Sequence, residues 1–244
     1  MQLLKKILIT GKIKAITGLL IGGSNSAMGI GGPDKTVIRN PVTNEPYIPG
    51  SSLKGKMRSL LEITHGTIGD KKMGNVYNGP SQNTTKVSTL LFGSTPEELV
   101  KQRPSRIIVR DGFLINGDEL SETDLPFTES KTEVVIDRVT SAAMPRTFER
   151  VPAGAVFQLN LVLNIFQDDP FSEDELKEQT MRALELVEDD YLGGSGSRGS
   201  GQVEFVIDSI KERSASYYQG QGEEKDITTE FAKNGKYSIT FSHA

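Results

Sequence analysis

Apolar and polar residues alternate along four stretches of the chain with the period of two that marks a half-buried β-strand. The alternation is clearest in residues 154–166, where phenylalanine and leucines alternate with glutamine and asparagines. In residues 2–16, isoleucines alternate with lysines, and residues 106–116 and 202–210 carry many β-branched residues. We therefore predict a strand in each of the four stretches.

Two other stretches repeat their apolar residues at helical spacing. Residues 52–65 follow Pro49 and Gly50, with Ser51 or Ser52 as the expected N-cap. Residues 172–189 start at Ser172, and their first turn is acidic, which the helix dipole favours. The apolar stripe of the first helix consists of Leu53, Met57, Leu60, Leu61 and Thr64.

The order of these elements predicts an α+β fold with a ferredoxin-like or RRM-like βαββαβ core in a single domain. Proline- and glycine-rich residues 24–50 form a long loop, and two extended arms around a proline and small residues predict a protruding hairpin. The expected parts are a core at about 2–65, 106–120 and 151–212, a mobile insertion at about 66–105, the hairpin at about 126–150, and a tail at 213–244 without a prediction.

Charge is distributed unevenly along the chain, although the formal net charge is only −4. Residues 1–66 carry nine Lys/Arg against three Asp/Glu, whereas residues 168–190 carry ten acids against two bases. A basic N-terminal third favours contact with a polyanion. The alternative is that the acidic segment is one solvated helix and that the basic excess has no function.

The composition narrows the compartment and the chemistry. No apolar run approaches the roughly 18 residues that span a membrane, and the N-terminus has no hydrophobic signal region. The chain has no cysteine, which excludes disulfides, thiol catalysis and cysteine zinc sites and fits the cytoplasm. We expect a cytoplasmic protein without a membrane partner.

Two segments have the composition of phosphate-binding sites. In PGSSLKGKMRSLLE at 49–62, two serines, Lys54, Lys56 and Arg58 gather at a helix start, where backbone N–H groups point outward. In LGGSGSRGSG at 192–201, glycines allow close approach to a phosphate and Arg198 adds a cation. The alternatives are a helix with solvated lysines and a flexible turn.

The predicted hairpin carries residues suited to RNA. Arginine binds phosphate or stacks on bases, and phenylalanine or methionine wedges between bases. The alternative is a surface hairpin that packs on a neighbouring protein. The candidates are Arg138, Met144, Arg146, Phe148 and Arg150.

Few residues are available for nuclease chemistry. The chain has only two histidines, His65 and His243, so a paired-histidine mechanism is disfavoured. It has no HxxxH, HD or DxD motif to hold two metal ions. A carboxylate that binds one divalent cation, or positions the reacting 2′-hydroxyl, is the remaining option. Asp34, in the glycine-rich loop, is one such group, although a lone acid in such a loop is most often a turn residue.

Five segments together resemble the RAMP-superfamily backbone subunits of type III-A CRISPR (Csm) complexes. They are TGLLIGG at 17–23, PDKTVIRNP at 33–41, IPGSSLKGKMRSLLE at 48–62, DRVTSAAMPRTFERV at 137–151 and DYLGGSGSRGSGQVEF at 190–205. The resemblance covers most of the chain in order and is weak at 66–105 and after about 210.

The resemblance implies a filament of several copies along a CRISPR guide RNA, with other Csm subunits as partners. It implies that Asp34 cleaves single-stranded target RNA with Mg²⁺ or Mn²⁺, and that the hairpin is a thumb that displaces bases of the guide–target duplex. No zinc is expected. The RNA-binding residues would be Gly22, Gly23, Ser51, Ser52, Lys54, Lys56, Arg58, Arg138, Met144, Arg146, Phe148, Gly193, Gly194, Ser195, Gly196, Ser197 and Arg198.

Three functions stay open at this point. The first is a metal-dependent endoribonuclease that binds guide RNA. The second is a non-catalytic RNA-binding filament subunit of a related CRISPR complex, in which Asp34 is a turn residue. The third is a stand-alone nuclease that processes guide RNA, which the poor supply of histidines disfavours.

Overall fold

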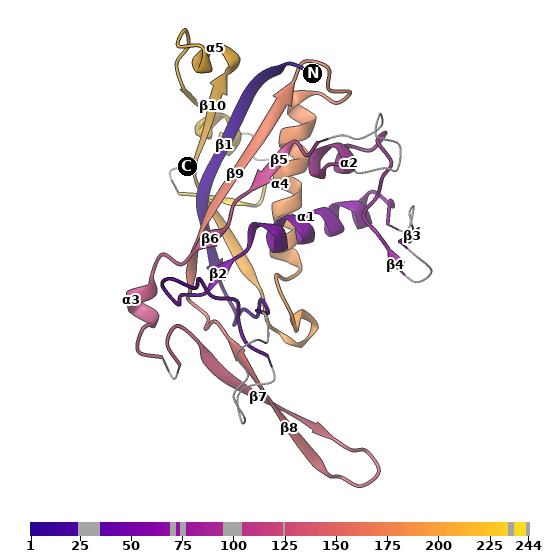
Figure 1. Ribbon diagram of the computed structural model, residues 1–244, viewed down its shortest axis with the longest axis vertical. Helices are drawn as coiled ribbons and strands as arrows, with labels where there is room; N and C mark the ends of the chain where they lie inside the picture. The colour runs from indigo at the N-terminus through magenta and orange to yellow at the C-terminus, as the bar shows by residue number, and fades with distance from the viewer. Residues whose placement is uncertain are drawn as a thin grey trace.

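The four predicted strands assemble into one antiparallel sheet, extended at one edge by two short strands. The computed structural model describes residues 1–23, 35–68, 72–73, 77–94, 104–123, 125–233 and 237–242. The strand order is β11-β10-β1-β9-β5, and β12 pairs with β10 in parallel (Figure 1). The strands are β1 (Leu3–Ala15), β5 (Ile107–Val109), β9 (Val156–Phe166), β10 (Val203–Ser214), β11 (Lys225–Asp226) and β12 (Thr240–Phe241).

The connections between these strands give the topology. Helix α1 (Gly50–Thr64) follows β1, and helix α4 (Glu173–Asp189) follows β9. With β1, β5, β9 and β10 counted as strands one to four, the spatial order is four, one, three, two. This is the ferredoxin-like βαββαβ plan, so the prediction of fold class is confirmed.

The core lies between the sheet and these two helices. Alternate residues of β1 and of the first half of β9 are buried, as the period-two pattern predicts, whereas all five residues 161–165 of β9 are buried. Leu53, Met57 and Leu61 bury the stripe of α1. Each fully buried side chain of this size contributes about 1.5–3 kcal/mol. Ser172 caps α4 as predicted, because its hydroxyl accepts a hydrogen bond from the Glu175 N–H at 3.2 Å.

The second predicted strand, residues 106–116, is broken. It divides into β5 and β6 (Gly112–Phe113), and β6 pairs with β2 (Tyr47–Ile48) instead of continuing the main sheet. A Cβ at position 112 would collide with the Gln158 carbonyl oxygen, so a glycine is required where the chain turns away. Helix α3 (Gly117–Leu120) follows.

The expectation of a mobile insertion is wrong for part of residues 66–105. Helix α2 (Val87–Phe92) lies in this stretch, and all six of its residues are buried. Two short strands, β3 (Lys72–Met73) and β4 (Tyr77–Asn78), pair with each other. The polar composition of the stretch concealed this short apolar helix, which packs against α1 and α4.

The predicted hairpin is present and projects from the lower end of the molecule in Figure 1. It consists of β7 (Glu129–Ile136) and β8 (Ala143–Arg150), paired from Glu129 with Arg150 to Ile136 with Ala143. The loop 192–201 contains a short 3₁₀ helix, η2 (Gly196–Arg198).

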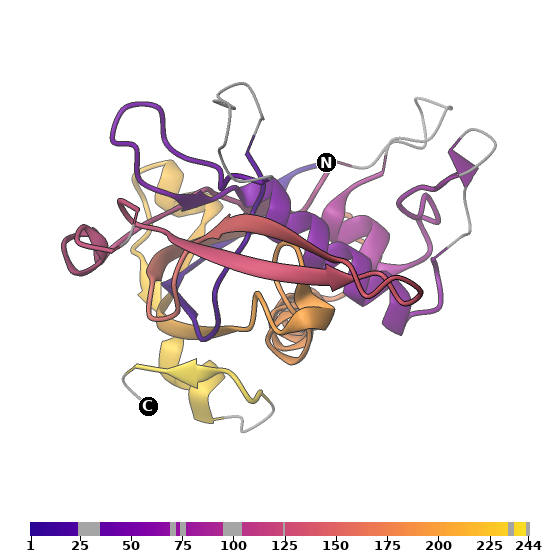
Figure 2. The same ribbon diagram turned by 90° about the horizontal axis from the view of Figure 1, so that it is seen from below.

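The tail adds to the fold. It forms α5 (Ala215–Tyr218), β11, α6 (Thr228–Lys233) and β12, and it buries Ile227, Phe231 and Ile239. Figure 2 shows the yellow C-terminal part of the tail at the bottom, with the orange α4 between it and α1. The acidic α4 is therefore not a solvated helix: Glu185 is buried and accepts the Ser238 N–H at 2.6 Å. Among the described residues, no helix is long and apolar enough to span a membrane.

Candidate nucleic-acid interface

A groove of about 760 Å³ opens between α1, the glycine-rich loop 192–201 and the two segments 20–23 and 35–36. Most of its lining residues have small or hydroxyl side chains, and two are lysines. Its size suits a ligand of several tens of atoms. The groove is lined by Leu20, Ile21, Gly22, Gly23, Lys35, Thr36, Ser51, Ser52, Gly55, Lys56, Ser59, Gly193 and Gly194. It thus brings together seven residues that the sequence analysis selected.

The glycines bring the groove's backbone segments close together. Gly193 has a φ of +81°, and a Cβ there would collide with the Leu20 carbonyl oxygen. The Gly194 N–H donates to the same oxygen at 2.7 Å. A Cβ on Gly23 would press on the Val37 carbonyl oxygen at 3.0 Å. The glycines therefore build the wall of the groove as well as exposing backbone to a ligand.

Helix α1 contributes the floor. Ser51, Gly55 and Ser59 are four residues apart, so they share one exposed helix face. A Cβ on Gly55 would meet no atom within 4 Å, so no neighbour in the described structure requires a glycine. A glycine in a helix interior costs about 1 kcal/mol relative to alanine. The helix gives up this stability at a position that faces the groove.

Lys56 is the lysine of α1 that lines the groove. Its Nζ donates to Asp190 Oδ2 at 2.8 Å and lies 3.7 Å from the centroid of the Tyr191 ring. The Tyr191 ring also fills the space where a side chain on Gly196 would lie. Asp190 and Tyr191 therefore fix the lysine at the edge of the glycine-rich loop.

The start of α1 differs from the prediction. Pro49 is the N-cap residue, and neither Ser51 nor Ser52 caps the helix. The Gly50 N–H donates to Asp111 Oδ1 at 2.7 Å. An acid therefore compensates the helix dipole, and it comes from a residue 61 positions away, at the break between β5 and β6.

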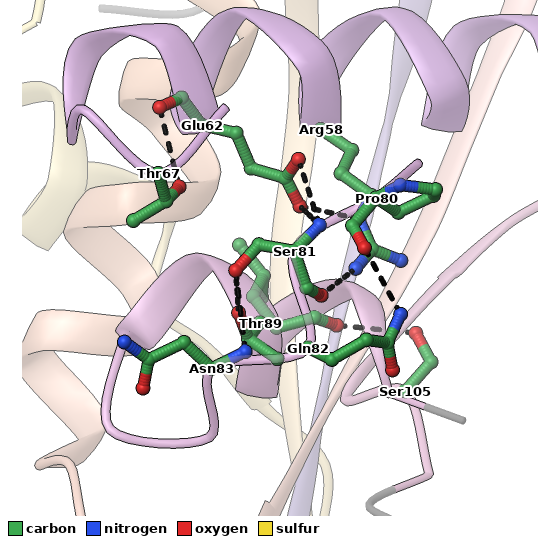
Figure 3. A network of polar contacts seen from close by, with 10 residues as sticks. Arg58, Glu62, Thr67, Pro80, Ser81, Gln82, Asn83, Thr89 and Ser105 are labelled. Atoms are coloured by element: carbon green, nitrogen blue, oxygen red, sulfur yellow. Dashed lines mark hydrogen bonds and ion pairs between the residues drawn. The ribbon is translucent and has the colours of Figure 1, made fainter. Parts of the chain in front are cut away.

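Lys54 and Arg58 lie outside the groove lining, which corrects the expectation that all three cations of α1 form one phosphate site. Lys54 Nζ donates to Ser105 Oγ at 2.9 Å, and burial and the nearby Arg58 charge lower its pKa. Arg58 donates from Nε to Glu62 Oε1 at 2.6 Å and from Nη2 to the Ser81 carbonyl oxygen at 2.8 Å (Figure 3).

These contacts give Arg58 a structural role. The Glu62 carboxylate is buried and accepts the Ser81 N–H at 3.2 Å from both oxygens (Figure 3). The Arg58–Glu62 pair therefore fastens the chain before α2 to the back of α1. The helical spacing placed Arg58 on the face of Lys54, but the sequence did not reveal which face meets the insertion.

The remainder of the glycine-rich loop leads toward the hairpin. Ser195 adopts a left-handed conformation with a φ of 61°, and Gly196, Ser197 and Arg198 form the 3₁₀ turn that follows. An Arg198 guanidinium nitrogen lies 3.5 Å from a carboxylate oxygen of Glu133 on β7. These four residues lie beyond the groove lining and connect it to the hairpin.

The candidates on the hairpin divide into exposed and buried residues. Arg138, Met144 and Arg146 are exposed, and Met144 is opposite Val135. Phe148 is only 9% exposed, and the Lys35 ammonium lies 5.7 Å from its ring centroid. The expectation that Phe148 wedges between bases is therefore wrong, because its ring is packed at the hairpin base.

Asp34 lies outside the described residues, and so does His243. Lys35, the residue that follows Asp34, lines the groove. Within the described ranges, no three His, Asp or Glu side chains gather as a metal site, and the groove lining includes no carboxylate. The described lining fits phosphate and does not by itself fit a divalent cation.

Sequence reasoning missed six lining residues: Leu20, Ile21, Lys35, Thr36, Gly55 and Ser59. Gly55 and Ser59 repeat the position of Ser51 at helical spacing, so the sequence held a signal for them. Lys35 and Thr36 reach the groove because their segment pairs with residues 21–23. No pattern in the local sequence predicts that pairing.

Comparison with known proteins agrees with this fold. Residues 12–204 match the family model of the RAMP superfamily. The chain is 42% identical over 207 residues to the CRISPR system Cms endoribonuclease Csm3 of Enterococcus italicus, which covers 84% of this chain and 92% of the relative. The protein of the same name from Methanothermobacter thermautotrophicus is 39% identical over 243 residues, or 93% and 94% of the two chains.

Two solved structures are similar. A chain of the Csm3–Csm4 subcomplex of the type III-A CRISPR-Cas interference complex has a TM-score of 0.58 and 30% identity, over 93% of this chain and 90% of that chain. A chain of the type III-B Cmr-beta complex bound to cognate target RNA has a TM-score of 0.57 and 18% identity, over 86% and 62%. The second likeness shows the fold alone.

Proposed function

Because this chain belongs to the Csm3 endoribonuclease family of the RAMP superfamily, we propose that it is the guide-RNA-binding backbone subunit of a type III-A CRISPR interference complex. In this role it cleaves bound target RNA at regular intervals. Its partners are the guide RNA, the target RNA, further copies of the chain in a filament, and other Csm subunits. We propose the cytoplasm as its compartment, in keeping with a chain that contains no cysteine.

The groove is the observation that carries the proposal of RNA binding. Serine hydroxyls, the Lys56 ammonium and glycine-rich backbone converge there from three parts of the chain. Hydroxyls, cations and backbone N–H groups are the usual partners of nucleic-acid phosphates, and such contacts carry no base sequence. Base pairing with the guide then supplies the sequence specificity, as in guided DNA recognition.

Cleavage is assigned to Asp34 by the resemblance of PDKTVIRNP to the family and by the position of Lys35 in the groove lining. The described lining offers no carboxylate, so we propose that Asp34 and RNA oxygens together hold one Mg²⁺ or Mn²⁺. Such an ion, when bound, would stabilise the charge that develops on the reacting phosphate. A single positioned side chain typically contributes about 10²–10⁴-fold to the rate, so we expect slow cleavage.

The first prediction concerns D34A in the complex assembled with guide RNA and partner subunits. We expect target RNA to bind as in the wild type and cleavage to be lost, because the groove remains and the carboxylate is gone. Gel analysis of labelled target, with and without Mg²⁺, measures cleavage, and filter binding measures affinity. Normal cutting by the D34A complex would refute the assignment, and indifference to metal in the wild type would favour a non-catalytic backbone.

A further inference from the structure

Glu149, on β8 at the base of the hairpin, joins three segments that are distant in sequence. It is 6% exposed, and both carboxylate oxygens accept hydrogen bonds. Oε1 accepts from Arg39 Nη2 at 2.5 Å and from Thr128 Oγ1 at 2.8 Å. Oε2 accepts from the Val37 N–H at 3.0 Å.

Arg39 extends the same junction. Its Nη1 donates to the carbonyl oxygens of Asn44 at 2.8 Å and Pro126 at 3.0 Å, and its Nη2 also donates to Thr128 Oγ1 at 2.9 Å. The planar fork of an arginine satisfies acceptors in several directions, which the single ammonium of a lysine does not. The Arg39–Glu149 pair therefore holds segment 37–44 against residues 126–128.

Glu149 is ionised at neutral pH. Burial alone would raise its pKa, but hydrogen bonds from Arg39, the Val37 N–H and Thr128 outweigh burial and hold the pKa below its ordinary value. A glutamine has one acceptor oxygen and an amino group. In E149Q the side-chain NH₂ would therefore face either the Val37 N–H or the Arg39 guanidinium, both of which are donors. Only a carboxylate accepts from both.

The contacts of Glu149 reach the groove. Its N–H donates to the Lys35 carbonyl oxygen at 3.0 Å, and the Gly23 N–H donates to the Thr36 carbonyl oxygen at 3.0 Å. The two stretches that flank residues 24–34 are thus paired with each other, and Glu149 fastens the second stretch to the hairpin.

We propose that Glu149 is a positioning residue for RNA cleavage, which holds segment 35–39 in register with the base of the hairpin. This inference rests on the proposed function, because segment 35–39 continues the loop that carries Asp34. Arg39 is its partner in this role. A displacement of about 1 Å at a reacting centre costs on the order of 10²-fold in rate, so a small shift of this segment is enough to matter.

The test is E149Q in the assembled complex. We expect the single-turnover cleavage rate at saturating target to fall on the order of 10²-fold, while guide retention and target affinity stay within about twofold, because the groove side chains of α1 are untouched. We expect R39K to act in the same direction, and E149Q/R39K to cost little more than E149Q alone, because both substitutions break one junction.

The matched control is D169N. Asp169 forms a buried ion pair with Arg106, with both side chains 3% exposed, at the end of β9 and away from the groove lining. D169N should lower thermal stability as E149Q does and leave the cleavage rate of bound target unchanged. This comparison separates positioning from a general loss of stability.

Each outcome decides a separate question. Wild-type cleavage by E149Q, in a preparation where D34A is inactive, overturns the positioning role and leaves the proposed function standing. An equal loss of cleavage in D169N also overturns it. Cleavage by D34A instead counts against the catalytic assignment. If E149Q does not assemble, R39K decides: slow cleavage with normal affinity supports the role, and normal cleavage rejects it.

Discussion

At the scale of single residues, the three cations of α1 show how tertiary contacts separate side chains that look alike in sequence. Lys54, Lys56 and Arg58 lie within five consecutive residues. Lys56 lines the groove, whereas Lys54 and Arg58 bind the chain around α2. Position on the helix circle separates Lys56 from the other two, and the partner of each face determines its role.

This difference predicts that two alanine substitutions affect different properties, RNA binding in one and stability in the other. K56A should weaken RNA binding about equally for all sequences and lower the slope of log K against log[salt] by about 0.7, the value for one single-strand phosphate. R58A should instead lower the free energy of unfolding by about 3–5 kcal/mol, because it leaves the buried Glu62 carboxylate without its cation.

Salt-dependent binding assays and urea unfolding measure the two effects, with K54A as the comparison for a cation of α1 outside the groove. A loss of RNA affinity in R58A at unchanged stability would contradict the assignment.

At the scale of elements, the hairpin has an exposed distal half and an anchored base. Val134, Val135, Ile136, Val139 and Met144 are exposed apolar residues near its tip. An isolated two-stranded hairpin is at best marginally stable in water. Its base is therefore held by Phe148, by the Arg150–Glu129 ion pair at 2.5 Å and by Glu149.

The two halves predict different consequences of truncation. M144A should change the free energy of unfolding by less than about 0.5 kcal/mol, because the side chain is 54% exposed. It should weaken target binding by roughly fivefold, at the low end of contacts with bases. F148A should cost about 3 kcal/mol of stability. Urea unfolding and target binding in the assembled complex test both substitutions. Wild-type target affinity in M144A would show that the Met144 side chain at the tip does not contact RNA.

At the scale of the whole molecule, buried and half-buried carboxylates couple the fold to pH. The pKa values of Glu149 and Glu173 both lie below the ordinary value of 4.5, although burial by itself would raise them. For Glu149, hydrogen bonds and the charge of Arg39 outweigh burial. For Glu173, hydrogen bonds and charges from Lys177 and Lys5 do so. Burial raises the pKa of Glu188. The first two residues connect the hairpin and α4 to their neighbours.

A carboxylate with a lowered pKa stabilises the fold above its ordinary pKa and loses that contribution as the pH falls, because the unfolded chain then binds more protons. Glu188 acts in the opposite direction. With the two lowered groups dominant, the free energy of unfolding should fall between about pH 5 and pH 3. Urea unfolding across this range measures it, and E149Q should flatten the curve. A flat profile for the wild-type protein would contradict the prediction.

Sequence patterns alone determined the βαββαβ core, the hairpin and the glycine-rich loop, because alternation, helical spacing and glycine content are local properties of the chain. They also located Ser51, Ser52, Lys56, Gly193 and Gly194 in the groove, and the family resemblance added Gly22 and Gly23. The tertiary structure decided which face of α1 lines the groove and which meets the chain before α2, and that Phe148 is anchored rather than free. It also decided that Asp111 meets the start of α1 and that Glu149 meets segment 35–39. These contacts join residues at least 23 positions apart, and only the folded chain brings such partners together.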